Sequence, residues 1–154
     1  LVRSKQEKRR IKASDFFKGI MDTAIEPNEL LVEIIVPKVP PGTGFAFVEI
    51  SRRHGDYALA GIAAQITLSG KTVTNVRLAA CGVGPCPVRL NDAEKQIFDD
   101  GLTEKSIQLA ARAAALEIDP ETDLHATADY RRRLTAVLTQ QALLKAKERA
   151  QEIS

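Results

Sequence analysis

Short apolar runs, or apolar residues at every second position, occur throughout the first half of the chain. Residues 30–36 are apolar except for Glu33 and rich in β-branched side chains, and a proline follows them, which predicts a largely buried strand. Residues 37–44 hold three prolines and two glycines and predict an exposed loop. Residues 45–51 form a second apolar run. The alanines of 58–68 would favour a helix, but the two-residue alternation there favours a half-buried strand.

A tight turn and one more strand complete the predicted sheet. Ser69-Gly70-Lys71 has the composition of a hairpin turn. In the returning strand, Val76, Leu78 and Ala80 lie on one face because side chains alternate across a strand. We therefore expect a four-stranded, mainly antiparallel sheet. The glycines and prolines of 81–87 predict that the chain leaves the sheet in a loop.

Three helices are predicted after this sheet. Asn91 or Asp92 can cap the first, which should end near Gly101; Thr103 can cap the second and Thr127 the third. The second has a stripe of small apolar residues: Ile107, Ala110, Ala111 and Ala114. The third has an apolar face at helical spacing: Leu134, Leu138, Ala142, Ala146, Ala150 and Ile153. Strands followed by helices predict an α+β sandwich, with helices covering one sheet face and leaving the other for partners or neighbouring domains.

The segment before the first predicted strand carries fewer structural signals. Ser14 can cap a short helical turn over residues 15–17, which Gly19 would close. We expect Phe16 and Phe17 in this turn to be core residues.

Composition narrows the functional classes. A chain of 154 residues with 44% hydrophobic and 27% charged residues is globular rather than disordered, and it lacks the long apolar stretch of a membrane span. Its net charge of +2 is too small to indicate nucleic acid, so the basic runs 3–12 and 131–133 are expected to be solvated. Two cysteines, Cys81 and Cys86, can build neither a disulfide framework nor a structural zinc site. We expect a protein of the cytoplasm.

The residues give no positive support for catalysis. Common motifs for nucleotide binding, serine nucleophiles and zinc are absent. Residues 82–85 contain two glycines, but Pro85 removes an amide that a phosphate cradle would use, which favours a plain turn. His54 and His125 have no paired nucleophile in the sequence, and we expect both to face solvent.

The most informative stretch is 45–65, where a strand-like run ends in a polar turn. Gly55-Asp56 has turn chemistry, and Tyr57 follows directly before the chain becomes apolar again. An aromatic residue at such a sheet rim can meet a ligand or a partner. The plainer interpretation is an ordinary turn with Tyr57 half-buried.

Residues 52–61, Arg-Arg-His-Gly-Asp-Tyr-Ala-Leu-Ala-Gly, resemble the signature of the C-terminal domain of molybdenum-hydroxylase flavoprotein subunits. These are the medium subunits of carbon monoxide dehydrogenase and the equivalent part of xanthine dehydrogenases. Further segments similar to the family occur in the same order: 14–17, 29–31 with 36–37, 82–89 and 128–131.

The resemblance implies an FAD-carrying electron-transfer subunit of a molybdopterin-dependent hydroxylase or dehydrogenase. Its partners would be a large molybdenum subunit, which carries molybdopterin, and a small subunit with iron–sulfur clusters. The FAD would be held mainly by an N-terminal region of the same subunit. Residues 1–13 would be the tail of that region and 14–154 the C-terminal domain, which would not be catalytic alone. No nucleic acid and no membrane insertion are expected.

The resemblance also implies a set of cofactor-binding residues. Tyr57 would lie against the isoalloxazine ring, with Gly55 and Asp56 shaping its loop, and Leu31 would face the flavin from an apolar strand. Val48 stands in the region where some relatives, xanthine dehydrogenases among them, have a lysine that contacts the flavin. A charge contact there is therefore in doubt.

Other interpretations stay open. Arg52 and Arg53 are expected to fix the loop through backbone or carboxylate contacts rather than to bind FAD directly. The chain could be an assembly domain with no direct flavin role. A weaker alternative is a nucleic-acid-binding module that uses residues 3–12 and 131–133.

Overall fold

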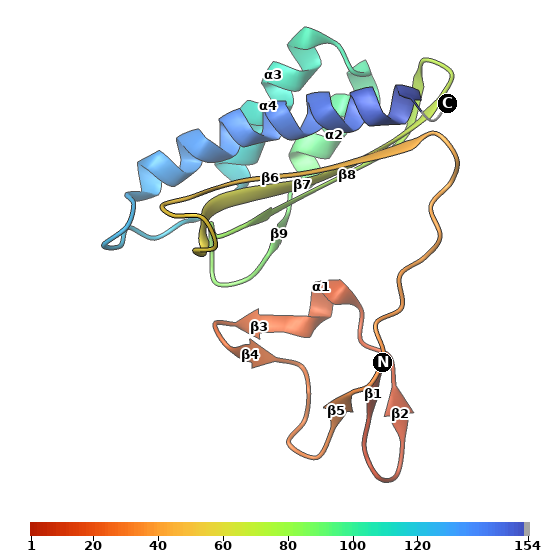
Figure 1. The fold of residues 1–154 in the computed structure, drawn as a ribbon, viewed down its shortest axis with the longest axis vertical. Helices are drawn as coiled ribbons and strands as arrows, with labels where there is room; N and C mark the ends of the chain where they lie inside the picture. The colour runs from red at the N-terminus through yellow and green to blue at the C-terminus, as the bar shows by residue number, and fades with distance from the viewer. Residues whose placement is uncertain (153–154) are drawn as a thin grey trace. The chain divides into compact units, whose positions relative to one another are not determined.

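The computed structural model describes residues 1–152, and the chain divides into two compact units, residues 1–39 and the chain from residue 40 onward (Figure 1). Each unit is described by itself. None of the helices among the described residues is long and apolar enough to cross a membrane.

The first unit is built from very short elements. They are β1 (Val2–Arg3), β2 (Lys8–Arg9), α1 (Ala13–Phe16), β3 (Phe17–Gly19), β4 (Asp22–Thr23) and β5 (Leu30–Leu31). Strands β2, β1 and β5 form one antiparallel sheet, and β3 pairs with β4. The Arg9 guanidinium joins these parts: it donates to both carboxylate oxygens of Glu29, at 2.7 and 2.6 Å, and to the Ala24 carbonyl at 2.7 Å. This bidentate pair and the Glu26 amide hold the pKa of Glu29 at about 2.

The buried strand predicted over residues 30–36 is wrong. Only Leu30–Leu31 is a strand, and the apolar side chains of the run are exposed, Ile34 to 77% and Val36 to 79%. A sheet of two-residue strands has too little area to form a second layer over them.

The helical turn predicted from Ser14 is also placed incorrectly. Helix α1 begins two residues earlier, at Ala13 after Lys12, and no side chain caps it; Ser14 lies inside the helix and its hydroxyl donates to Asp15. Phe17 already belongs to β3, because the chain turns back into the β3–β4 hairpin. Phe16 is half-buried and Phe17 exposed, so neither is a core residue.

The second unit contains the predicted four-stranded antiparallel sheet. Its strands are β6 (Thr43–Ser51), β7 (Ala58–Ser69), β8 (Thr72–Cys81) and β9 (Val88–Arg89), in that spatial order. The β7–β8 hairpin turns at Gly70, as predicted. The fourth strand, however, is β9 and not the segment 30–36. A two-residue strand inside a loop has no apolar pattern by which the sequence could reveal it.

The predicted loop 37–44 ends earlier than expected. Strand β6 begins at Thr43, and residues 42–44 are buried. The Thr43 hydroxyl donates to the Pro40 carbonyl at 2.7 Å and lies 2.9 Å from the hydroxyl of Thr67 on β7. These contacts pin the start of β6 to the sheet.

Three helices follow: α2 (Asn91–Asp100), α3 (Glu104–Glu117) and α4 (Ala128–Glu152). Thr103 caps α3 in a capping box with Ser106, and the Thr127 hydroxyl accepts from the Tyr130 amide, as predicted. The predicted cap of α2 is wrong because Asn91 and Asp92 are already helical.

The amides of Asp92 and Ala93 donate to the Glu117 carboxylate at 3.0 and 2.9 Å. Helix α2 is therefore capped by a side chain from the end of α3, which no local sequence signal could indicate.

The helices lie over one face of the sheet, with α4 running along β6 and β7 (Figure 1). Alternate residues of β6, β7 and β8 meet the predicted apolar faces of α3 and α4 in one core. Of the α4 face, Ile153 lies outside the described residues; the other members are buried. Within the described part of the second unit, the other face of the sheet carries no helix (Figure 1). The predicted α+β sandwich, a four-stranded antiparallel sheet followed by helices, is confirmed.

Candidate functional site

The turn between β6 and β7 is closed by its own hydrogen bonds. The Arg53 carbonyl accepts from the Ser51 hydroxyl at 2.8 Å and from the Asp56 amide at 3.1 Å. The Asp56 carboxylate accepts from the Tyr57 amide at 3.0 Å. Gly55 has φ +84°, a conformation that favours glycine. The sequence Gly-Asp therefore builds a defined turn.

Tyr57 projects fully from this turn. Tyr57 is 95% exposed, so the expectation that it is half-buried is wrong. An exposed aromatic ring on a braced turn offers a flat apolar surface without first having to leave a packed core. His54 beside it and His125 are both exposed, as predicted.

Arg52 and Arg53 act on the turn in the two ways expected of them. The Arg52 guanidinium lies 3.4 Å from the Asp56 carboxylate, an exposed ion pair of small energetic value that closes the turn. Arg53 contributes its backbone carbonyl, which accepts the two hydrogen bonds described above.

Behind the turn lies a residue that sequence reasoning missed. Arg131, in the first turn of α4, is only 7% exposed. Its guanidinium donates to the carbonyls of Leu59 and Gly82, at 2.7 and 2.8 Å, and to the Asp123 carboxylate at 2.8 Å.

The expectation that 131–133 is a solvated basic run is therefore wrong for its first member. The helical spacing contained the signal: Arg131 lies three and seven residues before Leu134 and Leu138, on the apolar face of α4. Because Arg131 is buried, this run does not form the continuous basic surface that nucleic acid would need.

The glycine-rich loop after β8 packs against the same place. A Cβ at Gly82 would lie 2.5 Å from the Ala58 carbonyl oxygen, and Gly82 has φ +73°. Close backbone approach to the start of β7 thus explains this glycine, and a phosphate site is not needed to explain it. The Asp123 carboxylate accepts from the amides of His125 and Ala126, and together with Arg131 they hold its pKa at about 2.

Two predicted cofactor residues are not part of the turn between β6 and β7 that carries Tyr57, here called the Tyr57 turn. Val48 is 8% exposed and its side chain belongs to the core under the helices, whereas Glu49, the next residue, is exposed on the open face. Leu31 belongs to β5 in the first unit, where it is exposed. The structure thus brings Gly55, Asp56 and Tyr57 together in one turn.

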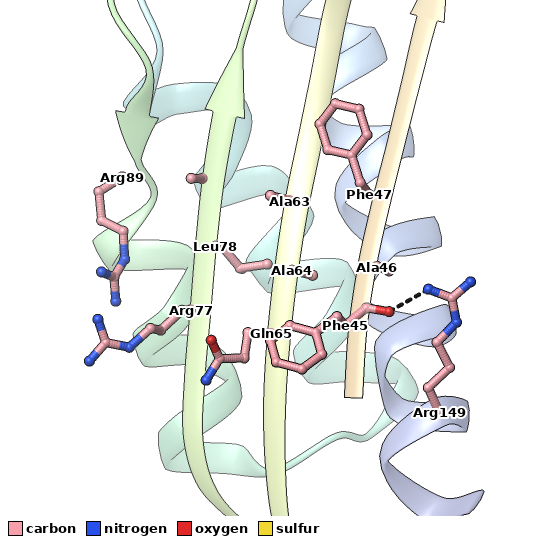
Figure 2. A pocket seen from close by; sticks show the side chains of 11 residues that line it. Phe45, Ala46, Phe47, Ala63, Ala64, Gln65, Arg77, Leu78, Arg89 and Arg149 are labelled. Atoms are coloured by element: carbon pink, nitrogen blue, oxygen red, sulfur yellow. Dashed lines mark hydrogen bonds between the residues drawn. The ribbon is translucent and has the colours of Figure 1, made fainter. Parts of the chain in front are cut away.

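The open face of the sheet is hollowed beside this turn's strands. A shallow hollow of about 510 Å³ has small residues, including Ala63 and Ala79, on its floor. Phe45 and Phe47 of β6 flank it, and Arg77 of β8 lies opposite, with Arg89 on β9 beyond (Figure 2). Arg89 pairs with Glu94. Arg149 of α4, which donates to the Phe45 carbonyl, also lines the hollow on the β6 side (Figure 2). No acidic residue among those described lines the hollow, so its lining combines apolar and positively charged groups.

The described residues hold no evident catalytic set. No cluster of three or more histidine, cysteine, aspartate or glutamate residues among 1–152 could bind a metal ion. Burial raises the pKa of the Cys81 thiol, and Glu49 adds to the shift, which is opposite to what a reactive thiolate requires. The arrangement presents surfaces to a ligand or partner instead of acid–base groups.

Comparison with known proteins gives consistent matches. The chain is 37% identical to the 6-hydroxypseudooxynicotine dehydrogenase complex subunit alpha of Paenarthrobacter nicotinovorans, over 97% of this chain and 51% of that protein. It is 35% identical to the carbon monoxide dehydrogenase medium chain of Hydrogenophaga pseudoflava, over 88% and 47%. The chain therefore spans about half the length of the curated relatives it matches.

A solved structure matches the fold as well. It is carbon monoxide dehydrogenase from Hydrogenophaga pseudoflava, in a form that lacks the Mo-pyranopterin moiety of the molybdenum cofactor. The match has a TM-score of 0.92 at 35% identity and covers 96% of this chain and 52% of that one. Residues 45–146, which contain the Tyr57 turn and Arg131, match the model of the CO dehydrogenase flavoprotein C-terminal domain. The chain belongs to this family, as its sequence motifs predicted.

Proposed function

We propose that this chain is the C-terminal domain of an FAD-carrying electron-transfer subunit in a molybdenum hydroxylase-type oxidoreductase, and that the Tyr57 turn forms a wall beside the flavin. The observation that carries the proposal is the exposed ring of Tyr57 on a braced turn, inside the segment that matches the flavoprotein family. The fragment itself is not proposed to be catalytic.

The residues of this chain fit one part of FAD. An exposed aromatic ring with an anchored backbone suits stacking against a planar isoalloxazine ring. The glycine loop at 82–85 does not suit the pyrophosphate, because packing against Ala58 explains Gly82 and Pro85 lacks an amide hydrogen. The phosphates would therefore be held by another region of the same subunit.

Bound FAD would supply the redox chemistry by accepting and passing on electrons. Tyr57 would cover one face of the ring and keep water and oxidants from it, and Gly55 and Asp56 would fix the direction of the tyrosine. Leu31 would add an apolar contact from the first unit. Val48 would act only through the backbone of β6, since its side chain is in the core.

The open sheet face supports the second part of the proposal, which is assembly. We propose that the rest of the FAD subunit, a large molybdenum subunit with molybdopterin and a small iron–sulfur subunit are its neighbours. The hollow flanked by Phe47 and Arg77 is suited to an apolar partner surface with acidic groups. The proposal includes a cytoplasmic location and no binding of nucleic acid.

The test is substitution of Tyr57 in the complete flavoprotein subunit. Tyr57→Ala is expected to shift the flavin absorption bands and to change the rate at which the reduced flavin is reoxidised, because one ring face becomes open to solvent. Tyr57→Phe should retain the spectrum, since it keeps the ring. Tyr130→Ala, at a second exposed tyrosine, is the matched control.

A Tyr57→Ala subunit with unchanged spectrum, FAD affinity and reoxidation rate would contradict the flavin role. It would favour the alternative of an assembly domain without flavin contact.

A further inference from the structure

Strand β7 begins directly after Tyr57. At this beginning, β7 has no paired strand on the side of β8. The register of β7 with β8 ends at Gly61 opposite Cys81, so residues 58–60 extend past the last backbone pair on that side. On the other side, Ile50 pairs with Ala60 and Ser51 with Ala58, so the register shifts there and leaves Leu59 of β7 without a partner residue in β6. A carbonyl beyond the end of a ladder must find another donor if it is buried.

Arg131 supplies that donor. Its guanidinium bonds to the carbonyls of Leu59, two residues after Tyr57, and of Gly82, the residue that follows β8. It thereby bridges the two strands where their own pairing has stopped. A planar guanidinium can serve several acceptors at once, which an ammonium group cannot do with the same geometry.

The guanidinium is itself anchored from two directions. The backbone of Arg131 belongs to α4, and the Arg131 carbonyl accepts from the Thr135 hydroxyl at 2.9 Å. Its second terminal nitrogen donates to Asp123, whose other carboxylate oxygen closes the loop before α4. The buried charge is therefore paired with a carboxylate and bonded to two backbone carbonyls, an arrangement in which a buried arginine is a rigid support.

We propose that Arg131 is a positioning residue for the Tyr57 turn: it replaces the missing strand partner of Leu59 and so fixes the base from which Tyr57 projects. Asp123 holds the guanidinium in place. The consequence for the flavin rests on the proposed function, whereas the effect on the turn does not.

The experiment compares variants of the complete subunit by peptide-resolved hydrogen exchange. Arg131→Met removes all three bonds while keeping an unbranched apolar stem, and Arg131→Lys keeps the charge without the fork. Arg132→Met is the matched control, because among residues 1–152 the adjacent Arg132 makes surface ion pairs alone, with Asp119 and Asp129. Peptides covering 52–61 report on the turn, and peptides covering 65–76 report on the centre of the β7–β8 hairpin.

In Arg131→Met, exchange in 52–61 is expected to rise about tenfold or more, since the buried Leu59 carbonyl and the partly buried Gly82 carbonyl lose their donor, with little change in 65–76. Arg131→Lys should restore part of the protection. Arg132→Met should match the unmodified protein. Asp123→Asn, which keeps the loop but weakens the charge pairing, should give a smaller rise and is decisive if Arg131→Met does not fold.

Equal exchange in Arg131→Met and Arg132→Met would overturn the proposal, and so would a uniform rise in both peptides, which would make Arg131 a general stability residue. If Arg131→Met does not fold, unchanged exchange in Asp123→Asn would overturn it. The flavin spectrum separates the two hypotheses. A loosened turn together with a flavin spectrum insensitive to Tyr57→Ala would contradict the proposed function and leave the positioning role intact.

Discussion

Gly44 shows how a single residue sets the distance between the sheet and its helix layer. A Cβ built at Gly44 would lie 2.1 Å from the carbonyl oxygen of Ala146 and 2.3 Å from the amide nitrogen of Ala150. Both are backbone atoms of α4, so a flexible side chain cannot move aside to make room. The helix crosses β6 in direct backbone contact, and the alanines of its apolar face permit that approach.

Gly44→Ala is therefore expected to lower the free energy of unfolding by about 3 kcal/mol, because α4 must move away from the sheet or the strand must bend. Gly70→Ala is the control: its Cβ meets open space, and only its φ of +60° is unfavourable, which should cost about 1 kcal/mol. Chemical denaturation of both variants checks this. Equal losses would contradict the close-contact explanation.

The buried Arg131 marks where residue-level prediction from the sequence failed and why. Runs of charged residues are usually solvated, and the prediction followed that rule for the whole run 131–133. It overlooked that Arg131 lies on the apolar face of α4. The turn residues Gly55, Asp56 and Tyr57 were located correctly because turn chemistry is local. The sequence left open whether Tyr57 is exposed or half-buried, since its exposure depends on what the surrounding elements leave uncovered. A direct flavin contact of these residues stays a prediction.

At the scale of elements, local signals predicted most of the second unit. Features that depend on a few neighbouring residues were predicted correctly. They are the alternation in β7 and β8, the turn at Gly70 and the helix caps at Thr103 and Thr127. The failures involve distant partners. The cap of α2 comes from Glu117 on another helix. The two-residue strand β9 is defined by its pairing with β8, which is distant information that its own residues do not carry.

The loop that joins α3 to α4 should make stability depend on acidity. Hydrogen bonds from the amides of Ala126 and His125, and then from Arg131, lower the pKa of Asp123 from 3.8 to about 2 in the folded state. The unfolded chain therefore takes up this proton at a higher pH than the folded one does. The carboxylate's contribution to stability is complete above about pH 4 and is lost as the pH falls toward the folded pKa.

Unfolding of the unmodified chain and of Asp123→Asn, followed at pH values from neutral to about 2, tests this prediction. The stability difference between the two should be constant near neutrality and shrink below about pH 4. Glu29, whose pKa is likewise held at about 2, remains unchanged in both proteins and serves as the internal background. A difference that does not change with pH would contradict the assigned role of the Asp123 carboxylate.

For the whole molecule, the order of strands and then helices was enough to predict the α+β sandwich and its open sheet face. The first unit was predicted poorly because residues 30–36 have a core-like composition but are exposed in the structure. The composition of a segment indicates how much apolar surface it could bury. It does not indicate whether another part of the protein covers that surface. The assignment of residues 1–13 to a preceding FAD-binding region, separate from 14–154, stays a prediction.

The measurement that tests the account most directly is flavin retention by the chain and by the complete subunit. Each is mixed with FAD, desalted and examined by visible absorption. We predict that residues 1–154 emerge colourless, because they offer a wall without a pyrophosphate cradle, and that the complete subunit emerges yellow. A stable yellow chain would contradict the placing of the phosphate site elsewhere, and a colourless complete subunit would contradict the FAD role itself.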